Sequence, residues 1–355
     1  MKKTKRLLCF ALAGCVSVLA ASCGGEQAKE SGSGSGKTEN EYTEILADGN
    51  FDLGFNLYGP DSRYHALFPW AQLTFDSTED PLWKLDTWGC FVNYWSDTER
   101  TFVEDGKTYT YPARPLAAKK SGNYTEISNG TTTVSVDPDR GTVVMKQDAS
   151  EEYGVTPAYG DLPRISSPRK NGEAWPHLLI EQYLVSNKAA GDFDEIVYSL
   201  EFSVDECENL TGEGYDPSLH AAQLQWYTTF KCAKQDSKFF NRYIWFGIPL
   251  FDSRTDRVTQ SAFLDGGKED STGMLIYVTD AFDFVPEKIE TGKRYRASVN
   301  MKPQIEQAFR AAQKKGLFTD CTLEDMKFDT MNIGWELPGT FGVASTISGL
   351  SIGCK

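Results

Sequence analysis

The sequence predicts a mostly β protein, built as one large antiparallel two-sheet sandwich with one or two short helices. Three observations support this fold class. Short strand-like runs recur from about residue 42 to the C-terminus, clusters of Gly, Pro, Asn and Asp separate them, and one segment alone shows a clear helical pattern. The roughly 310 residues of this region are long for one sandwich but within the range of a single large domain.

Residues 1–22, "MKKTKRLLCFALAGCVSVLAAS", have the three parts of a secretory signal peptide: four cations, an apolar run and small residues. The apolar run is shorter than the about 20 residues that a membrane-spanning helix needs. The following "LAASC" resembles the lipobox of bacterial lipoproteins, so Cys23 is the predicted lipidation site. A second match ends at Cys15, but it leaves an apolar run of only about five residues, against the roughly 7–15 expected. A soluble secreted protein cut nearby is the alternative.

Residues 23–41 are rich in Gly, Ser and Glu and show no apolar periodicity, which predicts a flexible tether behind the lipidated cysteine. A tether of about 17 residues reaches roughly 20–25 Å. Residues 42–355 are then expected to form a single domain, and a small N-terminal subdomain ending near residue 170 is the alternative. Together these features predict a protein that is exported and lipid-anchored to the bacterial cell envelope, at the outer membrane or cell surface.

The charge of the chain restricts its partners. The formal net charge is -14, and removal of the four positive charges of residues 1–22 makes it -18. Such an acidic surface repels phosphate backbones, so nucleic acid is excluded as a partner. The remaining predicted partners are a membrane, reached through the lipid anchor, and a ligand of the folded domain.

Five cysteines remain after the signal and anchor positions are set aside: Cys90, Cys207, Cys232, Cys321 and Cys354. An odd number cannot all pair within one chain, and no pair has the CxxC spacing of a zinc site. Export permits one or two disulfides. Buried free thiols are the alternative.

The predicted strands follow one another at residues 108–111, 131–136, 141–147, 177–185, 195–204, 221–232, 242–251, 274–280, 295–301 and 345–352. These runs are rich in the β-branched and aromatic residues that strands favour. The two expected helical segments follow the ninth of them.

One helix is expected to begin at Pro303 and to end before Gly316. Proline is favoured in a first helical turn, glycine is favoured just past the end, and Ile305 and Phe309 fall on one face between them. Thr322, followed three residues later by Asp, resembles a capping box and indicates a further short turn.

Alternation along the strands predicts which side chains share a face. In "AAQLQWYTTFKC", Trp226 belongs to the apolar side, while Gln225 and Tyr227 lie on the other. In "NIGWE", Glu336 lies opposite Trp335. Solvent-exposed sheet faces usually carry Lys and Thr, whereas these strands carry amides, carboxylates and aromatic rings.

Amide and carboxylate groups beside aromatic rings suit a polyhydroxylated ligand, because they hydrogen-bond its hydroxyls while the ring supplies an apolar platform. Glutamine and glutamate that simply cover a wet face are the alternative. The predicted ligand-binding residues are Gln223, Gln225, Tyr227, His220, Trp245, Asn332, Asp252 and Arg254.

The strand pattern, the polar and aromatic face and the closing "STISGLSI" run resemble the concanavalin A-like and jelly-roll sandwiches of carbohydrate-active proteins. A lipidated form is similar to the surface lipoproteins with which Gram-negative bacteria capture or cut polysaccharides. The resemblance implies a jelly-roll sandwich with a glycan ligand. It transfers no catalytic residue, because the "ExDxxE" arrangement of laminarinase-like sandwiches is absent.

The strands also carry carboxylates that could act in catalysis. Glycoside hydrolysis needs two carboxyl groups about 5–9.5 Å apart. The candidate acids are Glu336, Glu181 and Glu201, and Asp252 and Asp265 are further carboxylates in this region of the sequence. A polysaccharide lyase, which would need a Tyr or His base and a cation for a sugar carboxylate, fits an acidic body less well. The sequence therefore predicts a glycan-binding lipoprotein that is either a binder or a glycoside hydrolase. The alternative is a structural or assembly lipoprotein with a protein-binding face and no catalysis.

No cofactor is predicted. With three histidines in the chain, no metal-binding triad is apparent. A structural calcium ion on loop carboxylates such as Asp137 and Asp139 is the one exception that the sequence allows, although turns alone account for both residues.

Overall fold

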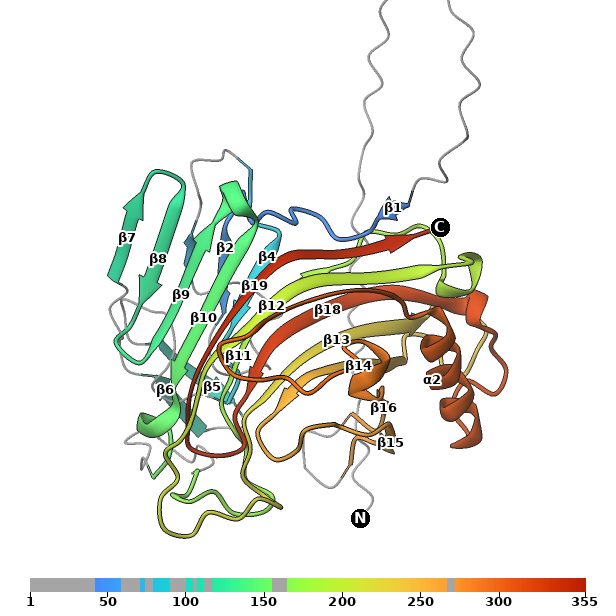
Figure 1. Cartoon of the computed structure of the whole chain (residues 1–355). Helices are drawn as coiled ribbons and strands as arrows, with labels where there is room; N and C mark the ends of the chain where they lie inside the picture. Colours follow the sequence, from blue (N-terminus) through green and yellow to red (C-terminus); the bar gives the residue numbers. More distant parts are fainter. Residues whose placement is uncertain are drawn as a thin grey trace, which may run out of the picture. The chain divides into compact units, whose positions relative to one another are not determined.

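Two β-sheets that pack against each other form the body of the protein in the computed structural model (Figure 1). The structure describes residues 42–58, 71–73, 79–89, 100–104, 107–111, 117–154, 165–266 and 272–355. Residues 41–355 form one compact unit. The prediction of a mostly β, two-sheet sandwich is confirmed.

The first sheet has eight strands, and all of its pairs are antiparallel. Its order is β17 (Arg294–Asn300), β12 (Ile196–Asn209), β19 (Phe341–Cys354), β10 (Thr142–Asp148), β9 (Thr132–Asp137), β8 (Tyr124–Ser128) and β7 (Ala117–Ser121), with β1 (Thr43–Glu44) paired to β19.

The second sheet has nine strands and carries the candidate site. Its order is β15 (Ser261–Leu264), β16 (Leu275–Val278), β14 (Tyr243–Asp252), β13 (Gln223–Cys232), β18 (Met326–Glu336), β11 (His177–Tyr183), β4 (Trp83–Asp86), β2 (Phe55–Tyr58) and β3 (Ala71–Leu73). Two of its pairs, β14 with β16 and β2 with β4, are parallel, so this sheet is mixed rather than wholly antiparallel. A separate two-stranded sheet joins β5 (Arg100–Glu104) and β6 (Lys107–Tyr111).

The core lies between the two large sheets. Trp226 of β13 and Tyr198 of β12 are both fully buried, and their rings meet edge to face with centroids 4.9 Å apart. Trp335 of β18 is equally buried, and its Nε1 donates a hydrogen bond to Ser345 Oγ of β19 (2.9 Å). Because alternate residues point to opposite faces, this burial forces Gln225, Tyr227 and their neighbours onto the other face of the nine-stranded sheet.

The predicted helix is α2 (Lys302–Lys314), with Pro303 in its first turn and Ile305, Phe309 and Ala312 buried. It contacts β14 and β16 at one end of the sandwich (Figure 1). Thr322 and Asp325 form the expected capping box at the 3₁₀ turn η5 (Leu323–Asp325). The other described 3₁₀ turns are η1 (Pro138–Arg140), η2 (Ala149–Glu151), η3 (Ala190–Asp192) and η4 (Ala281–Asp283).

The four cysteines in the described part of the chain are free thiols. Cys232 Sγ lies 3.5 Å from Cys321 Sγ, and both side chains are buried. Burial raises the pKa of Cys321 to about 11 and that of Cys354 to about 12. Cys90 lies outside the described residues, so it adds nothing to the choice between disulfides and free thiols.

The predicted signal peptide, both lipidation candidates and the tether fall within residues 1–41, which lie outside the described residues. The proposed division of the chain therefore stays a prediction. Among the residues that the structure describes, no helix combines the length and the apolar character that crossing a membrane requires.

Candidate functional site

The candidate site lies on the face of the nine-stranded sheet that points away from the core. The register brings four polar side chains into one row across neighbouring strands. His177 of β11 is opposite Glu336 of β18, Glu336 is opposite Gln223 of β13, and Gln223 is opposite Asp252 of β14. These four residues are far apart in sequence, and only the pairing of the strands brings them side by side.

Two more rows continue the same face. Glu181, Asn332, Tyr227 and Gly247 form one of them. Leu179, Gly334, Gln225 and Pro249 form the row between, with Gly334 and Gln225 at its centre.

Nine of the twelve residues in these rows line a cavity of about 630 Å³; the other three are Glu181, Gly247 and Gly334. This volume lies within the roughly 300–1,000 Å³ that is typical of small-molecule sites. The lining combines aromatic rings with amides and carboxylates. It includes Trp88, Trp175, His177, Leu179, Gln223, Gln225, Tyr227, Trp245, Phe251, Asp252, Arg254, Phe263, Asp265, Asn332 and Glu336. We call this cavity the sheet groove.

Asp252 is held in place at the end of β14, and its side chain is 3% exposed. It accepts hydrogen bonds from Arg254 Nε (2.8 Å) and Nη2 (2.6 Å), and from Gln223 Nε2 (2.7 Å). Burial alone would raise its pKa, but the hydrogen bonds and the charge of Arg254 outweigh burial and lower the pKa. Asp252 is therefore an ionised carboxylate whose oxygens already have partners.

Glu336 lies in the same row, separated from Asp252 by Gln223, and its environment is different. Trp175 Nε1 donates a hydrogen bond to its Oε2 (3.2 Å), and His177 Nε2 lies 3.6 Å from the same oxygen. The His177 ring is stacked near Trp175 and tilted against Trp88, with centroids 5.9 and 6.0 Å away. Glu336 thus presents a carboxylate to the sheet groove from among aromatic rings.

Tyr227 and Trp245 form the aromatic part of the floor. Their rings meet nearly at right angles, with centroids 6.0 Å apart. The Tyr227 ring covers Gly247 so closely that a Cβ added there would lie 2.4 Å from the ring. Burial, and then the negative charge of Glu336, raise the pKa of the Tyr227 hydroxyl. The hydroxyl therefore stays protonated at neutral pH and can donate to a ligand.

The structure brings together most of the residues predicted to bind a ligand. Seven of them line the sheet groove: Gln223, Gln225, Tyr227, Trp245, Asp252, Arg254 and Asn332. Among the three candidate acids, Glu336 lines it as well, while Glu181 and Glu201 are absent from its described lining.

The other predicted residues have partners elsewhere. Glu181 shares the face but forms a buried ion pair with Lys84 Nζ (2.5 Å). Glu201 lies in β12 of the eight-stranded sheet and pairs with Arg294 Nη1 (2.9 Å). His220 is 1% exposed; its Nδ1 accepts from the Asp216 backbone N–H (2.9 Å), and its Nε2 donates to the Arg169 carbonyl oxygen (2.9 Å). These contacts suit structural roles, so none of the three belongs to the proposed site.

Trp88 and Trp175 were missed as site residues. Both lie in turns or loops beside strands, where no alternation predicts a direction for the side chain. Phe263 was missed because it lies in β15, a short edge strand of four residues, whereas Asp265, one of the carboxylates noted in the sequence, follows that strand and lines the sheet groove.

The loop carboxylates Asp137 and Asp139 have protein partners. Asp137 Oδ2 lies 3.4 Å from Arg140 Nε, and Asp139 Oδ1 accepts a hydrogen bond from Asn123 Nδ2 (2.8 Å). Within the described ranges, no group of three or more His, Cys, Asp or Glu side chains has the arrangement of a metal site.

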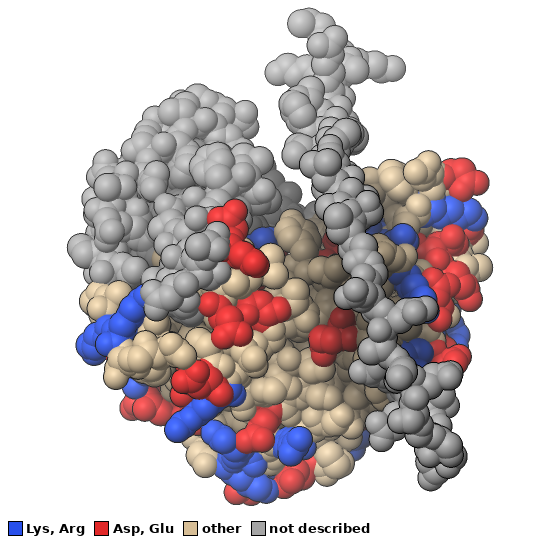
Figure 2. Space-filling view, turned by 90° about the horizontal axis from the view of Figure 1, so that it is seen from above, with Lys and Arg blue, Asp and Glu red and all other residues tan. Residues whose placement is uncertain are grey.

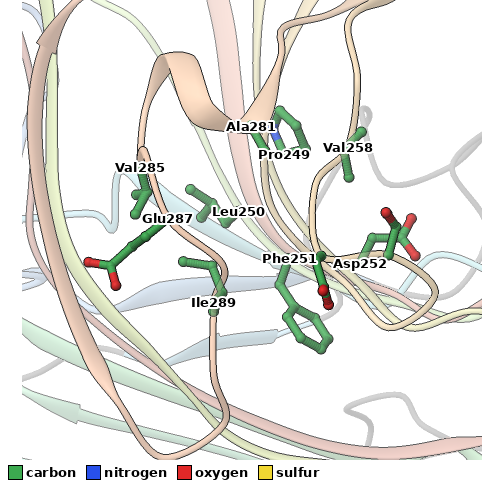
Figure 3. A pocket seen from close by; sticks show the side chains of 11 residues that line it. Pro249, Leu250, Phe251, Asp252, Val258, Ala281, Val285, Glu287 and Ile289 are labelled. Carbon is green, nitrogen blue, oxygen red and sulfur yellow. The ribbon is translucent and has the colours of Figure 1, made fainter.

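A second, much smaller hollow of about 20 Å³ lies at the end of β14 (Figure 3). Leu250, Val285 and Ile289 line it together with Asp252. A volume of about 10–15 Å³ is the minimum that holds one water molecule. This hollow is therefore too small for a sugar. A third hollow of about 700 Å³ is lined by Arg169, Asp216 and His220 among others, but its described lining contains no Trp, Tyr or Phe ring, so the sheet groove remains the candidate site for a sugar.

Comparisons with known proteins do not assign the chain to a family. No family model matches the sequence, and no curated protein matches it. Several solved structures are similar. A meso-active thermostable cellulase derived from Cel12A of Rhodothermus marinus is 11% identical with a TM-score of 0.36, covering 73% of this chain and 100% of the cellulase.

Two further structures are similar at the same level. The xyloglucanase domain of NopAA from Sinorhizobium fredii, in complex with cellobiose, is 10% identical (TM-score 0.35; 68% of this chain and 96% of that one). A family 12 xyloglucanase from Bacillus licheniformis is 8% identical (TM-score 0.36; 73% and 100%). TM-scores this low establish neither a shared family nor a shared activity, so the site is interpreted from its own residues.

Proposed function

We propose that the sheet groove binds a glycan. The observation that carries this proposal is the convergence of amides, a carboxylate and aromatic rings from four adjacent strands on one cavity. Tyr227 and Trp245 offer apolar faces to a sugar ring, and Gln225, Asn332 and Glu336 offer hydrogen bonds to its hydroxyls. Ligand sites of this size usually combine an apolar lining with a few convergent polar groups.

The alternative of a protein-binding face fits the same surface less well. A docking face for another protein is expected to be an apolar patch of several hundred Å². The polar row from His177 to Asp252 lies instead inside a concave site. The concavity and the buried polar groups therefore favour a small, hydroxyl-rich ligand.

Hydrolysis is a second candidate function, favoured by the two carboxylates in one row. Glu336 and Asp252 flank Gln223, so their strands are two spacings apart, or roughly 9.5 Å between backbones. Glycosidases place two carboxyl groups about 5–9.5 Å apart. The hydrogen bonds that Asp252 accepts occupy its oxygens. Glycan binding is therefore the stronger proposal.

A screen of the purified protein against a glycan array tests both. We expect binding of at least one glycan, and Glu336→Gln should weaken it because the neutral amide accepts hydrogen bonds less strongly than a carboxylate. Glu201→Gln on the eight-stranded sheet is the matched control and should bind like the parent. If the parent also cleaves the bound glycan, Glu336→Gln should abolish turnover. A folded parent that binds no glycan would contradict the proposal.

We also propose that Cys23 is lipidated and that the tether holds the domain at the cell envelope. The "LAASC" match and the following Gly, Ser and Glu-rich segment support this localisation. Cys23→Ser should release the protein from the membrane fraction and abolish labelling by a fatty-acid analogue. Cys15→Ser is the control, and release by that change alone would assign the anchor to Cys15 instead.

A further inference from the structure

Two cysteines from distant parts of the chain meet in the core. Cys232 is the last residue of β13, and Cys321 lies 89 positions later, in the turn between α2 and η5. Their Sγ atoms are 3.5 Å apart, and the two residues are 0% and 5% exposed. Two buried thiols in contact either pack as small apolar groups or are the two halves of a disulfide.

The backbone on both sides of this contact is fixed by hydrogen bonds. The Cys232 N–H donates to the Arg242 carbonyl oxygen (2.8 Å), and the Cys232 carbonyl oxygen accepts from the Asn241 N–H (2.9 Å). The Cys321 N–H donates to the Phe318 carbonyl oxygen (3.1 Å). Both sulfurs therefore project from backbone that is held in place.

Little movement separates the contact from a covalent bond. A disulfide has an S–S distance of about 2.05 Å, so the two sulfurs have to approach by about 1.5 Å. Rotation of the two side chains about their Cα–Cβ bonds moves the sulfurs by that amount, and the backbone can stay where it is.

The other two described cysteines cannot bond to each other. In the register of β12 and β19, Cys207 is opposite Val343 and Cys354 is opposite Ile196. Positions 196 and 207 of β12 are eleven residues apart, which is roughly 36 Å at about 3.3 Å per residue. The Cα atoms of a disulfide lie within about 7 Å of each other. Cys207 and Cys354 therefore serve as controls for the contacting pair.

Cys321 is the sulfur that an oxidant reaches first. Its chain neighbours Asp320 and Thr322 are exposed, whereas Cys232 is fully buried. Burial raises the pKa of Cys321 to about 11. Little thiolate is present at neutral pH, so oxidation should be slow there and should accelerate as the pH rises.

We propose that Cys232 and Cys321 are a disulfide site and that the bond ties the segment after α2 to the end of β13. A small disulfide such as oxidised glutathione is the oxidant. The Cys321 thiolate attacks one of its sulfurs and releases one glutathione thiolate; the Cys232 thiolate then attacks the Cys321 sulfur and releases the other. The two cysteine protons end on the two glutathione thiols, and the two electrons lost by the cysteines reduce the glutathione disulfide.

The bond would close a long loop of the chain that contains β14, β16 and α2. Such a cross-link removes conformational freedom from the unfolded chain and so stabilises the folded one. For a domain of about 310 residues, we expect the unfolding midpoint to rise by about 3–7 °C. Export, which the proposed lipidation of Cys23 implies, would bring the protein to a compartment where disulfides persist.

The test uses the purified full-length protein, reduced and then incubated with oxidised glutathione under native conditions. Remaining thiols are alkylated, and the protein is digested with trypsin without reduction. We expect mass spectrometry to find residues 232–234 linked to residues 316–327, the tryptic peptides that carry the two cysteines. Cys207→Ser should give the same linked peptides, and Cys321→Ala should not.

Thermal unfolding measures what the bond does. The oxidised parent should unfold about 3–7 °C above the reduced parent, and dithiothreitol should remove the difference. Cys321→Ala should show no difference between the two conditions. Because the main comparison is made within the parent, it stays decisive even if a cysteine substitution impairs folding.

Three results would overturn the proposal. Recovery of the two peptides unlinked, with or without glutathione attached to Cys321, rules out the disulfide site. Linkage that appears only after unfolding in urea shows that the native contact does not lead to the bond. A linked protein that unfolds at the same temperature as the reduced one rules out the tie. Neither readout involves a glycan, so the result is independent of the proposed function.

Discussion

The outward faces of the two sheets use similar polar residues in different ways. On the eight-stranded sheet these residues pair with one another: Ser199 Oγ meets Ser298 Oγ at 2.8 Å, and Glu201 pairs with Arg294. On the nine-stranded sheet, Gln225 keeps an acceptor without a partner in the described structure, and Glu336 stands among aromatic rings. The comparison teaches that polarity alone does not mark a ligand site. What distinguishes the nine-stranded sheet is that its polar groups and aromatic rings converge on one cavity.

The charged residues on the exposed surface are also arranged differently from those that line the sheet groove. On the face seen in Figure 2, acidic and basic side chains are interspersed among uncharged ones. Such mixing lets exposed charges neutralise one another and contributes little to stability. The described lining of the sheet groove instead contains three carboxylates and one arginine.

The largest expected difference between the two faces is in stability. Arg254→Ala leaves the Asp252 carboxylate buried without its main partner, and we expect it to cost about 2–3 kcal/mol of unfolding free energy. Arg294→Ala on the other sheet breaks a pair whose side chains are 60% and 31% exposed, and it should cost less than about 1 kcal/mol. Urea unfolding at neutral pH measures both. Equal losses would remove the distinction between the faces.

The next effect is on ligand binding. Trp245→Ala removes an aromatic platform of the sheet groove, and we expect glycan affinity to fall about tenfold, because aromatic contacts contribute about 0.5–1.5 kcal/mol beyond their buried area. Tyr124→Ala in β8 of the eight-stranded sheet, where the side chain is 36% exposed, is the matched control and should bind normally. Isothermal titration with a glycan identified by the array provides the measurement. Equal affinities in both variants would place the ligand elsewhere.

The smallest expected effect is the pH dependence of the Asp252 pair. The pKa of Asp252 is lower in the folded protein than in the unfolded chain. Its contribution to stability is therefore present above the unfolded pKa and is lost as the pH falls through the folded pKa. The stability gap between the parent and Arg254→Ala should narrow in acid, as measured by urea unfolding from pH 7 downward. A gap that stays constant or widens in acid would show that Arg254 stabilises the fold through packing rather than charge.

Much of the groove floor followed from alternation along single strands. The pattern of "AAQLQWYTTFKC" placed Gln223, Gln225 and Tyr227 together, and "NIGWE" placed Asn332 with Glu336, because a strand's side chains alternate between faces. The same reasoning could not choose between Glu181, Glu201 and Glu336. All three lie in strands, and nothing within a strand states which sheet it joins or which cation it meets.

The sequence by itself determined the fold class, the helix at Lys302–Lys314 and the division of each long strand into a core side and an outward side. These are local properties, since period and composition over a few residues suffice to specify them. Tertiary structure alone decided that β13 lies between β14 and β18, and so set Gln223 between Asp252 and Glu336. It also decided that Trp88 and Trp175 approach His177 from turns and loops. Strand order and loop placement depend on long-range packing, and a binding groove exists only after that packing is complete.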